Sequence, residues 1–124
     1  MELAEVVAVL RTHVAVARVA EMACKRLRIL CAPVGSEQAA AEAGAIEEVV
    51  AALRAHAQVE VVQGNGCGAL ARICGGGSGV RARRRRATQA GARTVALAAM
   101  QAHPDNDGVQ DYGRNLLNRL PAEV

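Results

Sequence analysis

Apolar residues recur at steps of three and four along most of the chain. Two long stripes of this kind are Val16, Val19, Ala23, Leu27 and Leu30 near the start, and Val59, Val62, Gly66, Leu70 and Ile73 in the middle. This spacing places the apolar residues on one face of an α-helix. The pattern therefore predicts an all-α fold built from amphipathic helices.

Two further helices are predicted between these stripes. The second of them covers residues 45–55, with an apolar stripe of Ile46, Val49, Val50 and Leu53. Residues 36–43 form a short Ala-rich helix with Ser36 as its N-cap. Gly44 separates the two helices, as Gly91 does later, and glycine tolerates the positive φ of a sharp turn after a helix. The predicted unit is a short helix, a glycine, a second helix, a small loop and a long helix.

This unit recurs along the chain. At a shift of 43 residues, positions 5–8 (EVVA) fall on positions 48–51 (EVVA), and at a shift of 47, positions 43–45 (AGA) fall on positions 90–92 (AGA). The additional residues of the longer copy fall in the glycine-rich stretch 75–79, where a loop insertion costs little. We predict one domain over residues 1–124 with about three repeats, at about 1–35, 36–78 and 79–120. The first repeat lacks the short helix.

The unit resembles the armadillo repeat, and the resemblance covers nearly the whole chain. The matching segments are residues 42–46 (EAGAI), 49–53 (VVAAL), Val59, 62–63 (VQ), Gly66 and 69–73 (ALARI). HEAT repeats are the nearest alternative, but they lack the short first helix and its glycine. The resemblance implies a right-handed α-α superhelix whose third helices line a concave groove that holds an extended peptide.

The resemblance also implies which residues line that groove. Carried over position by position, they are Lys25 and Ile29, Gly68 and Arg72, and Asn115 and Arg119. Family members that import nuclear cargo present Trp and Asn at these positions, and this chain departs from that pattern. The row is partly cationic, which favours an acidic, extended peptide. A non-catalytic protein–protein interaction scaffold is therefore expected, with partner-binding residues Lys25, Arg72, Asn115 and Arg119.

A run of arginines gives the alternative function. It consists of Arg81, Arg83, Arg84, Arg85 and Arg86, and it lies where the short first helix of the third repeat is expected. Such a cluster can bind phosphate backbones or act as a nuclear import signal, whereas the structural interpretation is a solvated helix start. Tyr112 is the only aromatic residue, so recognition of single strands by base stacking is not supported. A basic nucleic-acid-binding or nuclear-import adaptor is the alternative.

The cysteines and histidines do not have the spacing of a metal site. Six residues separate Cys24 from Cys31 and Cys67 from Cys74, whereas zinc ligands usually begin about two to four residues apart. The three histidines, His13, His56 and His103, recur at the same position of successive repeats. We therefore expect structural thiols and histidines at helix C-termini, where the helix dipole favours them, with no metal and no other cofactor.

No catalytic arrangement emerges from the sequence, so no enzymatic activity is expected. Residues 63–69 (QGNGCGA) after 59–62 (VEVV) resemble, in isolation, a strand that enters a dinucleotide-binding turn. The equivalent segments of the other copies lose these glycines and keep the helical stripe. Gly66 and Gly113 are better explained as positions where two helices cross closely, and Asp105 is expected to cap the last helix.

Composition narrows the picture further. Hydrophobic residues make up 52% of the chain, aromatic residues make up 1%, and the formal net charge is +3. No apolar run reaches the about 18 residues that a membrane helix needs, and Glu2 and Glu5 stand where a signal peptide is positively charged. We expect an intracellular protein, cytoplasmic in preference to nuclear, without a membrane partner.

The first predicted repeat exposes an apolar helix. Its stripe of Val6, Val7, Val9 and Leu10 has no preceding helix to cover it. Terminal repeats need polar caps, and about three repeats are the minimum for a stable array. The chain is therefore expected to be part of a longer solenoid, to self-associate or to need a partner.

Overall fold

The computed structural model describes residues 2–121, and within this range all regular secondary structure is α-helical. The helices are α1 (Leu3–Thr12), α2 (Ala17–Leu30), α3 (Ser36–Glu42), α4 (Ala45–Ala55), α5 (Glu60–Ile73), α6 (Val80–Ala90), α7 (Ala92–Ala102) and α8 (Asp107–Arg119). The predicted all-α fold is confirmed. Among these helices, none is both long enough and apolar enough to span a membrane.

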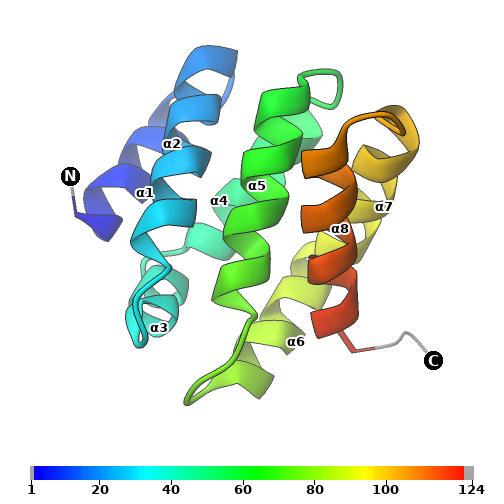
Figure 1. The fold of residues 1–124 in the computed structure, drawn as a ribbon. Coiled ribbons are helices and arrows are strands. Elements are labelled where there is room, and N and C mark those ends of the chain that lie inside the picture. The colour runs from blue at the N-terminus through cyan, green and yellow to red at the C-terminus, as the bar shows by residue number, and fades with distance from the viewer. Residues whose placement is uncertain (1, 122–124) are drawn as a thin grey trace.

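The helices lie in two layers (Figure 1). The long helices α2, α5 and α8 lie side by side, with α5 in contact with both of the others. Behind them α1, α4 and α7 form the second layer, and each packs against the long helix that follows it in the chain. The helices α3 and α6 cover one end of this arrangement (Figure 1).

The core consists of small and aliphatic side chains, and glycines allow its helices to approach closely. The largest fully buried aliphatic side chains are Leu10, Leu27, Ile46, Leu53, Leu70, Ile73 and Leu116. A Cβ atom at Gly66 would lie 2.5 Å from Cδ2 of Leu53, and one at Gly113 would lie 2.8 Å from Cγ of Met100. The interpretation of both glycines as close crossing points is confirmed. Residues 60–73 are helical, which removes the strand that a dinucleotide-binding turn would need.

Gly44 and Gly91 form matching corners, as predicted. Their φ angles are +92° and +96°, and each directly precedes a helix of the second layer. Beside each corner, an arginine of the preceding second-layer helix donates to a backbone carbonyl: Arg11 to Ala43 at 3.4 Å, and Arg54 to Ala90 at 3.2 Å. The two contacts occupy equivalent positions of the sequence repeat.

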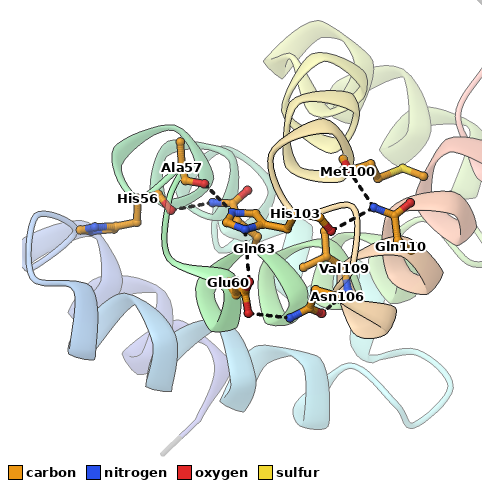
Figure 2. Close-up of polar contacts among 9 residues, drawn as sticks. All are labelled: His56, Ala57, Glu60, Gln63, Met100, His103, Asn106, Val109 and Gln110. Carbon is orange, nitrogen blue, oxygen red and sulfur yellow. Dashed lines mark hydrogen bonds and ion pairs between the residues drawn. The ribbon is translucent and has the colours of Figure 1, made fainter.

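Other polar contacts recur in the same way (Figure 2). Nε2 of His56 donates to the carbonyl of Val14 at 2.6 Å, and Nε2 of His103 donates to the carbonyl of Ala57 at 2.8 Å. Two glutamine side chains likewise donate to backbone carbonyls at the ends of α4 and α7. Nε2 of Gln63 reaches the carbonyls of Leu53 and His56, and Nε2 of Gln110 reaches those of Met100 and His103. The glutamines thereby satisfy the carbonyls of Leu53 and Met100, which lie in the last turns of α4 and α7 and have no helical N–H to accept.

Three details of the sequence prediction are wrong. The N-cap of α3 is Gly35, with φ +95°, and Ser36 is the first helical residue. The N-cap of α8 is Asn106, whose side chain accepts the N–H of Val109 at 3.0 Å, and Asp105 lies outside the helix. Both caps are one residue away from the prediction, because several neighbouring residues have capping propensity. The helix α6 has 11 residues, whereas a helix as short as α3, with 7, was expected.

The exposed surface of the first repeat is less apolar than expected. Although no helix precedes α1, its residues Val6, Val7 and Leu10 are buried, because α1 packs on α2 and α4. Val9 is half-buried, and Ala4 and Ala8 are the exposed apolar positions of this helix. Extension of the array, self-association or dependence on a partner remains a prediction.

Candidate functional site

A hollow of about 960 Å³ lies over α2 and combines cationic with apolar side chains. Its cationic lining residues are Arg18, Lys25, Arg26 and Arg28. The apolar ones come from α1, α2 and α5: Val6, Val9, Val19, Met22, Ala23, Ile29 and Val61. Glu21 and Asn65 complete the lining, so a single carboxylate faces four cationic groups.

Three large apolar side chains of this hollow are exposed to solvent. Met22 is 59% exposed, Val61 is 50% exposed and Ile29 is 44% exposed. A single exposed apolar residue on a protein surface needs no explanation, but a group of them around a concavity is typical of a binding surface. The face can therefore bury apolar side chains of a partner while its cations attract acidic ones.

The residues predicted for the groove fall into two kinds. Lys25 and Asn115 are exposed, on α2 and α8. Arg72 and Arg119 are half-buried, and each uses Nη1 to donate to a backbone carbonyl of the neighbouring long helix, that of Arg28 and that of Ala71 respectively. The two arginines therefore join α2 to α5 and α5 to α8. Each guanidinium keeps further N–H groups that these bonds do not use.

Arg28, which the sequence analysis did not identify, covers the middle of this face. Its Nε donates to Oδ1 of Asn65 at 3.2 Å, and its Nη1 donates to the hydroxyl of Tyr112 at 3.3 Å. The guanidinium lies 5.6 Å from the centre of the Tyr112 ring, within range of a cation–π interaction. The side chain crosses Gly68, where a Cβ atom would lie 2.6 Å from Cδ of Arg28. Gly68 is thus buried under Arg28, which itself forms this part of the surface.

The arginine run in α6 is not a uniformly solvated strip. Arg83 is only 2% exposed. Its Nε donates to the carbonyl of Ile73 at 2.8 Å, its Nη1 donates to Oε1 of Gln38 at 2.9 Å, and its guanidinium also reaches the carbonyls of Gly76 and Ser78. The interpretation of a solvated helix start is wrong for this residue. The end of α5 and the glycine-rich loop expose carbonyls that need donors, and Arg83 supplies them.

The other arginines of the run differ from one another. Nε of Arg84 donates to the carbonyl of Cys74 at 2.8 Å. Arg86 forms an ion pair with Glu47, with Nε 2.6 Å from Oε2, and also donates to the carbonyl of Ala41. Arg81 and Arg85 are exposed, and neither donates a side-chain hydrogen bond within residues 2–121. Only part of the run is therefore available to an external anion.

The four cysteines are buried, as expected for structural thiols. Burial raises the pKa of Cys24 and of Cys67 to about 12, and that of Cys31 and of Cys74 to about 11. The histidines follow the helix ends, since His13, His56 and His103 are the C-caps of α1, α4 and α7. Within the range that the structure describes, no three side chains of the metal-binding types form a cluster.

The raised thiol pKa values predict alkaline destabilisation. A thiol that titrates near 9 in the unfolded chain and near 12 in the folded one contributes stability that is complete below pH 9. This contribution is lost as the pH rises towards the folded value, at roughly 1 kcal/mol per pH unit for each such thiol. Urea unfolding at pH 7 and pH 10 measures the difference. Cys24→Ala should reduce this difference, and an unchanged difference would contradict the assignment.

The contacts that recur with the sequence repeat are the main features of this structure. No protein-family model matches the chain, and no match was found among curated proteins or solved structures.

Proposed function

We propose that the chain is a non-catalytic protein–protein interaction scaffold, which binds an extended, acidic segment of a partner across the face of α2, α5 and α8. In this proposal the helices form armadillo-type repeats stacked in a right-handed superhelix. The contacts of His56 and His103, of Gln63 and Gln110, and of Arg72 and Arg119 recur at the offset of the sequence repeat, which supports it.

The observation that carries the proposed function is the composition of the hollow over α2. Lys25 and the neighbouring arginines provide positive charge, while Met22, Ile29 and Val61 are exposed apolar side chains on the same surface. Successive side chains of an extended peptide point to opposite sides. A segment that carries acidic and apolar residues on the same side therefore complements this face in both charge and hydrophobicity.

The alternative, a basic nucleic-acid-binding or nuclear-import adaptor, has weaker support. A phosphate backbone needs several free cations in a row, and Arg83 is buried while Arg86 is paired with Glu47. An import signal is bound as an extended peptide, whereas residues 80–90 are helical. We therefore retain the scaffold as the proposed function.

A charge reversal at Lys25 tests the proposal. The probe is a short fluorescein-labelled peptide that repeats Glu-Glu-Leu-Leu, so that each side of the extended chain carries both residue types. Binding is followed by fluorescence anisotropy at low and at physiological salt. Lys25→Glu should weaken binding by about three- to tenfold, because an attractive contact at the rim of the hollow becomes repulsive. Lys25 is exposed and donates no side-chain hydrogen bond within residues 2–121, so the fold should be retained.

The matched control is Arg114→Glu, an equal change of charge at an exposed position of α8 outside the hollow. This variant should bind the peptide almost as well as the unaltered chain. An equal loss in both variants would indicate nonspecific attraction of an acidic peptide to a basic protein. That result, or full binding by Lys25→Glu, would refute the proposed face.

A further inference from the structure

A second recess, of about 410 Å³, lies between α6 and the end of α8 and is lined by four arginines. These are Arg81, Arg84 and Arg85 of α6, and Arg119 of α8. Asn118, Leu120 and Pro121 complete the lining, so no carboxylate of the described range faces these cations. Like charges gathered at one place repel each other, and a bound anion would relieve this repulsion.

The four arginine residues line the same space. Arg81, Arg84 and Arg85 are spaced at i, i+3 and i+4, which places them on one face of α6. Arg84 and Arg119 are held in position, because Nε of Arg84 donates to the carbonyl of Cys74 and Nη1 of Arg119 donates to that of Ala71. Their remaining N–H groups are available to a ligand. Two of the four arginine side chains are thus held in place before any ligand binds.

We propose that this recess binds the dianionic group of a phosphate monoester. A phosphate monoester carries close to two negative charges and three acceptor oxygens, which match several planar guanidinium groups better than one carboxylate does. The volume lies within the range of about 300–1,000 Å³ that is typical of small-ligand sites. A nucleic-acid backbone fits less well, because its phosphodiesters carry one charge each and because Arg83, between Arg81 and Arg84, is buried. The site is distinct from the hollow over α2 and does not depend on its function.

Isothermal titration calorimetry in a phosphate-free buffer tests this site. The probes are inorganic phosphate and a short phosphoserine peptide, with the unphosphorylated peptide as the control ligand. We expect saturable binding of phosphate, and a loss of at least about tenfold in affinity for Arg81→Ala combined with Arg85→Ala. Both side chains are exposed, so the double variant should keep its circular dichroism spectrum. The single variant Arg85→Ala provides the same test with a smaller loss if the double variant unfolds.

The outcomes separate the source of the ligand and the two proposed sites. Tighter binding of the phosphopeptide than of inorganic phosphate supports a phosphorylated partner, and equal binding supports a free phosphate ligand. Lys25→Glu should leave phosphate binding unchanged even where it reduces binding of the acidic peptide. Absence of phosphate binding, equal affinity in the double variant, or tighter binding of an oligonucleotide without a terminal phosphate would overturn the proposal.

Discussion

Replacing Arg83 by methionine is expected to lower the free energy of unfolding by about 3 kcal/mol or more. The side chain is buried and donates to the carbonyls of Ile73, Gly76 and Ser78 and to the side chain of Gln38. Methionine retains much of the apolar stem but none of these hydrogen bonds. The loss is large because the buried carbonyl of Ile73 would lose its donor and pay its desolvation cost, while the partly buried bonds to Gly76, Ser78 and Gln38 would also be lost.

Urea unfolding followed by circular dichroism measures this effect, and Arg85→Met is the matched control. Arg85 lies two residues further along α6 but is exposed, so its replacement should change stability by less than about 0.5 kcal/mol. Arg83→Lys should lower the free energy of unfolding by less than Arg83→Met but should not restore it, since an ammonium group cannot reproduce the planar fork of the guanidinium. Equal stabilities of Arg83→Met and Arg85→Met would show that the network around Arg83 does not hold the end of α5.

The helices could be predicted because their signals are local. The apolar stripe of residues 45–55 predicted α4 with the bounds that the structure shows. Gly44 and Gly91 marked the corners, since a positive φ strongly favours glycine. Gly66 and Gly113 could be recognised as close crossings because they interrupt an apolar helical stripe with the smallest residue. In each case the contact is with the preceding helix of the same repeat.

The candidate site could be predicted only in part, because its partners lie far apart in the sequence. Lys25 and Asn115 are exposed on the expected helices. No sequence pattern indicates that Arg28 crosses α5 to reach Tyr112, or that Arg83 turns inward to the carbonyls that end α5. A run of arginines has the same appearance in the sequence whether its members face solvent or backbone oxygens.

These long-range donors also explain how a chain with a single aromatic residue maintains the spacing of its helices. Arg72 and Arg119 reach carbonyls of the neighbouring long helix, and Arg11 and Arg54 reach carbonyls beside the glycine corners. Hydrogen bonds between charged donors and backbone carbonyls are directional and stronger than neutral ones. The bonds of Arg72 and Arg119 therefore fix the distance between neighbouring long helices. In the proposed function this is also the distance between the side chains that would face a peptide.

Gly66→Val is expected to be the most destabilising change at the interface of α4 and α5, with a loss of about 3 kcal/mol. A Cβ atom at this position would lie 2.5 Å from Cδ2 and 3.0 Å from Cγ of the buried Leu53, and 3.4 Å from Cγ1 of Val49. Leu53 cannot give way at its tip alone, so the two helices must separate or the side chain must leave its rotamer. Closely packed interiors resist both changes.

Alanine substitutions at two neighbouring glycines of α5 complete this test. Alanine favours a helix over glycine by about 1 kcal/mol, and a Cβ atom at Gly64 would have its nearest neighbour, Cγ2 of Val109, at 3.8 Å. Gly64→Ala should therefore raise the urea midpoint, whereas Gly66→Ala should lower it because overpacking outweighs helix propensity. If both alanine variants were equally stabilised, α4 and α5 could not be packed at the distance that Leu53 and Gly66 define.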